Sequence, residues 1–184
     1  GVYLDIGCYH PTRVNNTLSL YRKGWRGMNI DLNQLTIDMF NYARPGDINI
    51  CAAISNKEIK KKLYYLGDLD PKNTLDFKHK SWLKTTFNIS NKDIKTRYVK
   101  TLRLEKILDK HNFKEIDFMN IDIEGHEIEV LKSINFRKTK VNVICVEVLD
   151  YDKRKKKQLL NFFKKNNYFL KKRVSINYIF QKKS

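Results

Sequence analysis

Short apolar runs and longer amphipathic segments follow one another along the chain, which is the order expected when strands alternate with helices. Residues 1–11 begin with apolar positions, pass Asp5 and reach Gly7 before a turn that ends in proline. Residues 25–31 repeat the pattern and also end in an acid, Asp31. We predict two buried strands, each of which presents a carboxylate near its carboxyl end.

The rest of the chain continues this alternation. Further strands are predicted at residues 48–55, 61–66, 96–100, 116–121 and 141–148, followed by an antiparallel pair at 168–172 and 175–181. Helices are predicted at 12–23, after an N-cap at Asn33, at 102–110, after the turn that follows residue 121, and at 151–166. A chain of 184 residues can form one α/β domain of three layers, with a mixed sheet that has an antiparallel edge.

Residues 67–95 form the longest stretch between two predicted strands. Loops of this length in a compact domain are usually functional or partly helical. Trp82, Leu83 and Phe87 favour a short helix within it, and Asn73 and Thr74 are the polar groups most expected to face inward. We interpret residues 67–95 as a lid or a substrate-side insertion of the single domain.

Asp5, Gly7 and Asp31 together indicate a nucleotide-binding edge of the sheet. Glycine lets the backbone approach a ligand closely, and an acid at the end of the second strand can accept both ribose hydroxyls. The full G-x-G-x-x-G pattern is absent, so a dinucleotide pyrophosphate would be poorly held. This favours a nucleoside without phosphates, such as S-adenosylmethionine. The alternative is that Asp5 and Asp31 merely cap the ends of their strands.

A second acidic stretch follows the strand at residues 116–121. Asp122 and Glu124 lie in the turn and are expected to serve the site, whereas Glu127 and Glu129 are expected to be solvent-facing acids of the first helical turn. Glu147 interrupts the apolar strand at 141–148. Because an unpaired buried carboxylate costs several kcal/mol, we expect Glu147 to pair with a cation or to face the active-site opening.

Charge and composition limit the class of protein but do not identify its binding partner. Hydrophobic residues make up 41% of the chain, which argues against disorder, and none of the apolar runs has the length of a transmembrane segment. The net charge of +17 fits an anionic partner, such as nucleic acid, anionic glycolipid or a membrane surface. It fits equally well a solvated lysine-rich surface, as AT-rich coding sequences produce.

Three cysteines, Cys8, Cys51 and Cys145, lie far apart in or beside apolar stretches. They are interpreted as small buried hydrophobic residues in a reducing, cytoplasmic compartment rather than as disulfides or zinc ligands. Because the chain begins directly on a core strand, we expect a natural N-terminal segment to be missing or very short.

Four segments of the chain resemble the FkbM family of S-adenosylmethionine-dependent methyltransferases. These are residues 5–11 with 15–17, residues 24–27 leading to Asp31, residues 52–55, and residues 118–127 with 130–132. The resemblance implies a Rossmann-like class I methyltransferase domain with a seven-stranded sheet. It also implies O-methyl transfer to a hydroxyl of a sugar, a glycan or a related small molecule, in glycan biosynthesis.

The resemblance also assigns residues to the cofactor. Asp5 and Gly7 would surround the methionine part, Asp31 would bind the ribose, and Ala53 and Ile54 would lie beside the adenine. Cys8, Asn16, Thr17, Leu32 and Asp122 would also contact the cofactor. Asp122 and Glu124 would lie near the transferring methyl group. The sequence Cys8-Tyr9-His10 replaces the small turn of many methyltransferases.

Methyl transfer to an alcohol requires an aligned hydroxyl and a route for its proton. Asp122 and Glu124 are the first candidates for the orienting acid and the base, followed by His10 and His126. A structural hydrogen bond within its loop is the alternative for His10. Asp122, Glu124 and Glu147 could also converge on Mg²⁺, although nothing in their spacing requires a metal.

Two other functions stay open. The positive charge favours a nucleic-acid methyltransferase, but an Asn-Pro-Pro-Tyr motif for amino groups is absent from the sequence. The reduced glycine pattern is the one feature that favours a cofactor-binding module without transfer activity.

Overall fold

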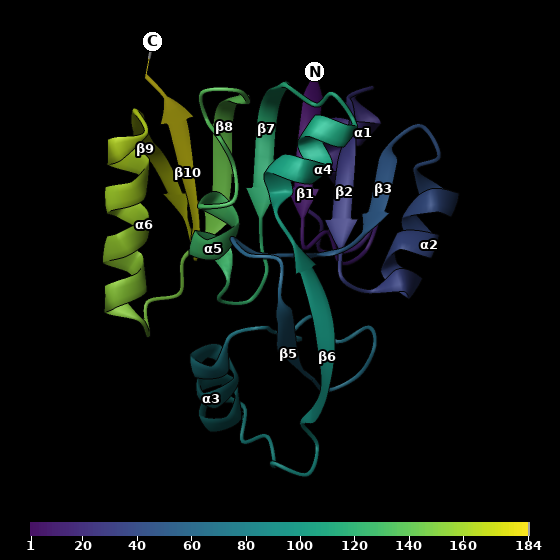
Figure 1. The fold of residues 1–184 in the computed structure, drawn as a ribbon, viewed down its shortest axis with the longest axis vertical. Helices are drawn as coiled ribbons and strands as arrows, with labels where there is room; N and C mark the ends of the chain where they lie inside the picture. The colour runs from purple at the N-terminus through teal and green to yellow at the C-terminus, as the bar shows by residue number, and fades with distance from the viewer. Residues whose placement is uncertain (184) are drawn as a thin grey trace.

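A seven-stranded sheet forms the centre of the computed structural model, which describes residues 1–183 (Figure 1). Its strands are β1 (Val2–Ile6), β2 (Arg26–Asp31), β3 (Ile48–Cys51), β7 (Glu115–Ile121), β8 (Lys140–Glu147), β9 (Tyr168–Val174) and β10 (Asn177–Lys182). The order across the sheet is β3-β2-β1-β7-β8-β10-β9. Strands β3, β2, β1, β7 and β8 pair in parallel, and β10 runs antiparallel to both β8 and β9. The predicted mostly parallel sheet with an antiparallel C-terminal pair is therefore confirmed.

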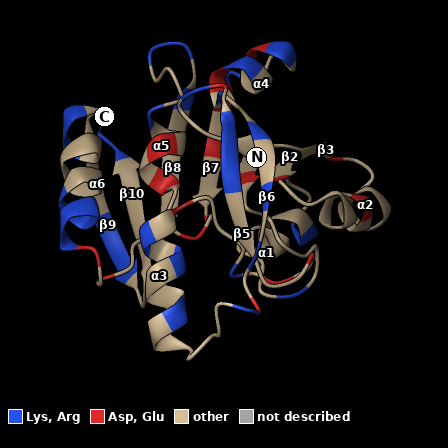
Figure 2. Ribbon diagram, turned by 60° about the horizontal axis from the view of Figure 1, so that its bottom comes forward, with Lys and Arg blue, Asp and Glu red and all other residues tan. Residues whose placement is uncertain are grey.

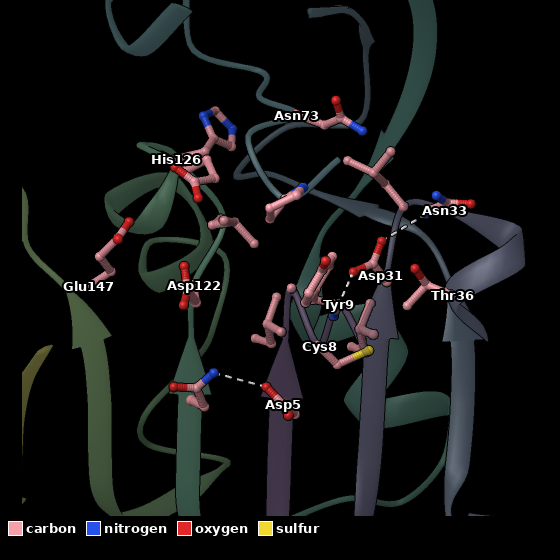
Figure 3. Close-up of a pocket in the computed structure, with 18 of the residues that line it drawn as sticks. Asp5, Cys8, Tyr9, Asp31, Asn33, Thr36, Asn73, Asp122, His126 and Glu147 are labelled. Atoms are coloured by element: carbon pink, nitrogen blue, oxygen red, sulfur yellow. Dashed lines mark hydrogen bonds between the residues drawn. The ribbon is translucent and has the colours of Figure 1, made fainter. Parts of the chain in front are cut away.

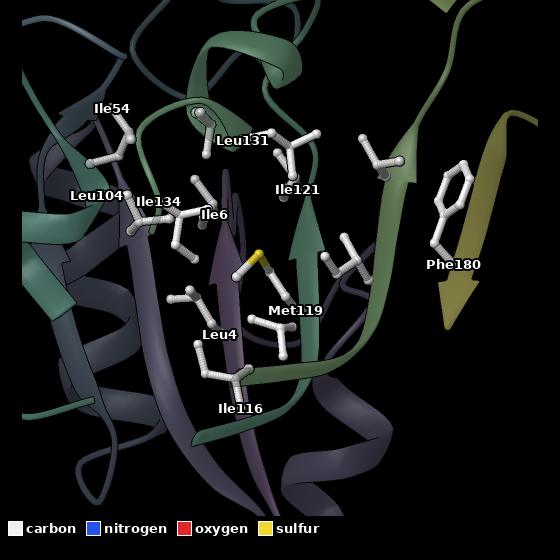
Figure 4. Close-up of a cluster of buried hydrophobic side chains, with 14 of the residues drawn as sticks. Leu4, Ile6, Ile54, Leu104, Ile116, Met119, Ile121, Leu131, Ile134 and Phe180 are labelled. Carbon is white, nitrogen blue, oxygen red and sulfur yellow. The ribbon is translucent and has the colours of Figure 1, made fainter. Parts of the chain in front are cut away.

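Helices cover both faces of this sheet. They are α1 (Leu18–Arg22), α2 (Gln34–Ala43), α4 (Leu104–Lys110), α5 (Glu127–Leu131) and α6 (Lys153–Lys165). Leu4 and Met119 point from neighbouring strands into a core that includes Leu104 of α4 and Leu131 of α5 (Figure 4). Because side chains alternate along a strand, Tyr3 and Asp5 face the opposite side, toward α1 and the end of α2.

A smaller sheet lies below the carboxyl edge of the main sheet (Figure 1). It has the order β4-β6-β5, with strands β4 (Ala53–Ile54), β5 (Lys60–Tyr65) and β6 (Lys95–Leu102). Strand β6 pairs in parallel with β4 and antiparallel with β5. Between β5 and β6 the chain forms α3 (Phe77–Thr86), the helix expected within residues 67–95.

Most predicted elements differ from the structure by a few residues at their ends, and two differ in a way that shapes the site. The strand expected at 48–55 divides at Ala52, whose N–H still donates to the Asp31 carbonyl, after which Ala53 and Ile54 leave the main sheet and pair with β6. The helix expected at 12–23 begins only at Leu18, because Asn15 and Thr17 turn their side chains inward toward Asp5.

Local signals at other positions are confirmed. Asn33 caps α2, since its side-chain oxygen accepts a hydrogen bond from the Leu35 N–H at 2.9 Å. Cys8 and Cys145 are buried, as expected, but Cys51 is exposed on the edge strand β3, so its predicted burial is wrong. Within residues 1–183 there is no helix long and apolar enough to cross a membrane.

Candidate functional site

A cavity of about 430 Å³ opens at the carboxyl ends of the parallel strands (Figure 3). Its walls come from the segments that follow four strands, namely residues 5–9, 31–33, 52–54 and 122–124. Residues 68–71 and Asn73 of the segment between β5 and α3 also line it, as do Glu147, Ile176 and Asn177. The cavity thus lies where ligands of open α/β sheets bind.

Asp31, the last residue of β2, lies at one end of this cavity. Its Oδ1 accepts a hydrogen bond from the Asn33 N–H at 2.9 Å, and its Oδ2 accepts one from the Tyr9 N–H at 3.1 Å. Burial raises the pKa of Asp31 to about 6, although both backbone donors act in the opposite direction. The carboxylate is therefore fixed in place and retains lone pairs that can accept further donors.

Asp5 lies on β1, and its fully buried carboxylate is part of the cavity wall. Its Oδ1 accepts from Asn120 at 2.9 Å, and its Oδ2 accepts from Thr17 at 2.7 Å and from Asn15 at 3.0 Å. Burial is the largest cause that raises the pKa of Asp5, and these three donors lower it. With its oxygens engaged in this way, Asp5 acts chiefly by fixing amide side chains that line the cavity.

The amides around Asp5 extend this network to the cavity wall. Asn16 donates to the Asn120 side-chain oxygen at 3.0 Å. Asn15, Asn16 and Asn120 all line the cavity, whereas Thr17 is fully buried below it. The sequence offered a signal for Asn120, because this amide interrupts an apolar strand; the structure places it directly beside Asp5 in the register of β1 and β7.

Arg44, at the end of α2, supports the same network and is only 1% exposed. Its guanidinium donates to Thr17 Oγ1 at 2.9 Å, Asn15 Oδ1 at 2.8 Å and the Pro11 carbonyl at 2.7 Å. A buried cation next to the buried Asp5 system stabilises the negative charge there. Nothing in the local pattern identified this arginine, since its partners come from a distant part of the sequence.

Gly7 follows β1 with φ +76°. A Cβ added at Gly7 would lie 1.8 Å from the Asp122 carbonyl oxygen. The glycine is therefore required for the close approach of two loops of the protein itself, in addition to its position on the cavity wall. Cys8 beside it is buried against Ile37 and Phe40 of α2 and presents part of its surface to the cavity.

Apolar side chains line part of the cavity. They include Leu32, Ala53, Ile54, Leu69 and Leu75. Asn33 and Thr36 add polar groups to the lining, although the sequence pattern did not assign either residue to the site. Asn73, expected to face inward, does line the cavity, and its amide is held by the Gly67 carbonyl at 2.7 Å and the Leu66 N–H at 3.1 Å.

Three carboxylates gather at the other end of the cavity. Asp122 and Glu124 come from the turn after β7, and Glu147 is the last residue of β8. One oxygen from each lies within 4.8 Å of the oxygens of the other two. Burial, followed by repulsion from the neighbouring acids, raises the pKa of Asp122 to about 7 and that of Glu147 to about 9.

His79 of α3 joins this group from the segment expected to be an insertion. Its Nε2 lies 2.8 Å from Glu124 Oε2, and its Nδ1 lies 3.1 Å from the Tyr151 hydroxyl. Tyr151 in turn stacks on Trp82, with ring centroids 4.7 Å apart. A Cβ added at Gly125 would lie 2.8 Å from His79 Cβ, so the glycine permits α3 to approach the acidic turn.

The two histidines expected to be catalytic occupy different environments. His126 lines the cavity, and its Nε2 lies 3.0 Å from Ser55 Oγ and 3.3 Å from Lys61 Nζ. Burial, together with the nearby Lys61, lowers its pKa to about 3, so the ring is neutral at physiological pH. His10 lies outside the lining, where its Nδ1 accepts from the Thr12 N–H at 3.2 Å.

The expectation that Glu127 faces solvent is wrong. Glu127 is buried, and its Oε1 accepts a hydrogen bond from the Gly125 N–H at 2.8 Å. Burial raises its pKa. The carboxylate closes the acidic turn onto the start of α5, which gives it a local structural role. Glu129 remains partly exposed beside Lys132.

The structure brings most of the predicted site residues together. The cofactor candidates that line the cavity are Asp5, Gly7, Cys8, Asn16, Asp31, Leu32, Ala53, Ile54 and Asp122. Of the catalytic candidates, Asp122, Glu124 and His126 line it. Thr17 and His10 do not.

Comparison with known proteins identifies the family. Neither the curated proteins nor the solved structures contain a significant match to the chain. The family model of the methyltransferase FkbM domain matches residues 5–170, which include nearly all the cavity lining. The chain therefore belongs to the FkbM methyltransferase family.

Proposed function

We propose that this protein is an S-adenosylmethionine-dependent O-methyltransferase that acts on a hydroxyl of a sugar, a glycan or a related small molecule. The observation that carries the proposal is a single cavity with a fixed Asp31 carboxylate at one end and three carboxylates at the other. Its volume of about 430 Å³ is in the usual range of small-molecule sites. Family membership and the strand order support a Rossmann-like class I methyltransferase domain.

In this proposal the residues at the carboxyl edge of the sheet would hold the cofactor. Asp31 would accept the ribose hydroxyls, and Leu32, Ala53 and Ile54 would contact the adenine. Gly7 and Asn16 would contact the methionine part, and Asp122 would lie near the methyl group that the cofactor supplies. Asp5, Thr17 and Arg44 act from below by holding the amides of Asn15 and Asn120 in place.

The transfer is an in-line displacement at the methyl carbon. When bound, S-adenosylmethionine would supply the methyl group: an acceptor oxygen would bond to the methyl carbon as the carbon–sulfur bond breaks, with the bonding electron pair left on sulfur. In the absence of a metal the hydroxyl proton would pass to Asp122, whose pKa of about 7 suits a general base at neutral pH. His126 is a weaker candidate for the base, because its pKa is far below neutral.

A nucleic-acid acceptor is the second candidate, and one surface favours it. Lys60, Lys62 and Lys100 share the outer face of the antiparallel β5–β6 pair with Tyr98, which is 68% exposed. Figure 2 shows basic residues along β6, α6 and β9. Basic side chains interleaved with an exposed aromatic ring can bind phosphates and stack on bases. Binding of RNA that weakens steeply with salt would favour this acceptor class.

The test is calorimetric titration of the full chain with S-adenosylmethionine and with S-adenosylhomocysteine. We expect one site of micromolar affinity for each ligand. Asp31→Ala should weaken both by at least about tenfold, since two charge-assisted hydrogen bonds are lost. Asp38→Ala is the matched control, because Asp38 is exposed on α2 and does not line the cavity.

Absence of binding to a folded sample would contradict the proposal. Binding without methyl transfer to any sugar or nucleic-acid acceptor would instead support a cofactor-binding module. Equal affinities of the wild type and Asp31→Ala would remove the ribose assignment alone.

A further inference from the structure

The carboxylates of Asp122, Glu124 and Glu147 converge from two adjacent strand ends onto one wall of the cavity. Their three nearest oxygens lie within 4.8 Å of one another. Like charges at such distances repel strongly inside a protein, where the effective dielectric constant is lower than in water. The arrangement is therefore unfavourable unless protons or a cation neutralise it.

Glu147 supplies a second, independent observation. Its side chain is only 7% exposed, and its Oε2 is buried without a hydrogen-bond partner in the described part of the chain. This residue also lines the cavity (Figure 3). Buried polar atoms are paired in the great majority of cases. An orphaned carboxylate oxygen on the wall of a cavity indicates a partner that is not a residue of this chain.

The basic side chains around this cluster do not supply that partner. Lys155, a partly exposed lysine of α6, bonds to Asp76 at 3.0 Å and to the Gly125 carbonyl. His79 engages Glu124. Neither Asp122 nor Glu147 forms an ion pair among residues 1–183.

We propose that Asp122, Glu124 and Glu147 bind a divalent cation that prefers oxygen ligands, of the Mg²⁺ or Mn²⁺ class. Carboxylates are the ligands that such hard cations prefer, and three of them leave coordination positions for water or acceptor oxygens. His79 contacts Glu124, as residues behind a metal-binding side chain commonly do to hold that side chain in its orientation.

The position of this cation site also indicates the chemical class of the acceptor. This inference depends on the proposed function. A cation at this end of the cavity is beside the expected position of the methyl group. A bound divalent cation lowers the pKa of a coordinated hydroxyl and holds it in a fixed direction. With the cation in place the hydroxyl would release its proton to solvent, and Asp122 would act as a ligand rather than as the base. The acceptor is then one that presents two neighbouring oxygens to the metal, such as a vicinal diol of a sugar.

Mn²⁺ binding to the full chain, freed of metal with a chelator, tests the site without any acceptor. Electron paramagnetic resonance of free Mn²⁺ is expected to show one saturable site. Glu147→Gln, which keeps the shape of the side chain, should weaken Mn²⁺ binding by at least about tenfold. Glu129→Gln is the matched control, because Glu129 is on α5 close to the same turn and does not line the cavity. It should leave the affinity within about twofold.

The same samples are titrated with S-adenosylhomocysteine and S-adenosylmethionine. If the protein binds Mn²⁺ but neither S-adenosyl ligand, the cation site is supported and the cofactor assignment fails. If it binds these ligands but not Mn²⁺, the cation site is overturned and the methyltransferase proposal stands. Equal effects of Glu147→Gln and Glu129→Gln would show adventitious surface binding and overturn the proposal. Release of Mn²⁺ by S-adenosylmethionine would overturn it too, because the carboxylates would then neutralise the cationic cofactor instead.

Discussion

The Nε2 atom of His79 lies 2.8 Å from Oε2 of Glu124, although 44 residues separate them in the sequence and His79 is completely buried. This contact joins α3, from the segment between β5 and β6, to the acidic turn after β7. The segment is thereby tied to the cavity through a specific side chain.

Replacing His79 with alanine should lower the free energy of unfolding by about 2–4 kcal/mol, because it removes a buried ring and leaves Tyr151 and Glu124 without their partner. Urea unfolding measures this change. His111→Ala, on a partly exposed residue at the end of α4, should stay within about 0.5 kcal/mol. A double-mutant cycle with Glu124→Gln should give a coupling energy of about 1 kcal/mol or more; strictly additive effects would contradict the contact.

Arg44→Met should be strongly destabilising. The change keeps most of the side-chain volume but removes a buried cation that donates to Thr17, Asn15 and the Pro11 carbonyl. Loss of one partner in a buried charged network costs about 3–5 kcal/mol. Thermal and urea unfolding should both report the loss. Arg22→Met, on an exposed arginine of α1, is the control, and a similar loss in that variant would refute the assignment.

Binding of S-adenosylhomocysteine should depend on pH through Asp31. Its carboxyl has a pKa of about 6 in the folded protein, so the form that accepts hydrogen bonds is lost as pH falls below this value. We expect the affinity to decrease by up to about tenfold per pH unit below pH 6. Asp31→Asn should bind weakly with little dependence on pH. A wild-type affinity that stays constant between about pH 5 and pH 7 would contradict this role for Asp31.

The sequence predicts the fold well wherever the signal is local. Strand patterns at β1, β2, β7 and β8 and the N-cap at Asn33 depend on neighbouring residues, so the pattern alone locates them. The positions of Asp31 and Asp122 on the cavity wall follow from the rule that ligands bind at the carboxyl ends of parallel strands.

The remaining features depend on contacts between distant residues. Arg44 and His79 find their partners only when the chain folds, and neither lies in a distinctive local pattern. The division of the 48–55 segment likewise depends on the pairing of Ala53 and Ile54 with β6. Glu127 occupies a helix position typical of exposed acids, but the Gly125 N–H draws it inward.

Gly7→Ala should destabilise the protein much more than Gly24→Ala. Both glycines have positive φ, +76° and +86°, so each substitution carries a backbone cost of about 1–2 kcal/mol. A Cβ at Gly24 meets nothing within 4 Å, whereas one at Gly7 would lie 1.8 Å from the Asp122 carbonyl oxygen. The difference in unfolding free energy between the two variants therefore measures the loop contact alone. Equal losses of unfolding free energy in the two variants would mean that the loops at Gly7 and Asp122 can move apart at no free-energy cost.

Glu147→Gln should stabilise the metal-free protein at neutral and higher pH. The folded state holds the Glu147 proton up to a pKa of about 9, while the unfolded chain releases it near the ordinary value of 4.5. Between these values the folded state binds more protons, so the wild type loses stability as pH rises, and glutamine has no such loss. In the presence of a chelator the variant should exceed the wild type by up to about 5 kcal/mol near pH 8 and match it near pH 4. An advantage that does not change with pH would instead indicate better packing, and a loss of stability near pH 8 would show that the carboxylate of Glu147 is already paired within the protein.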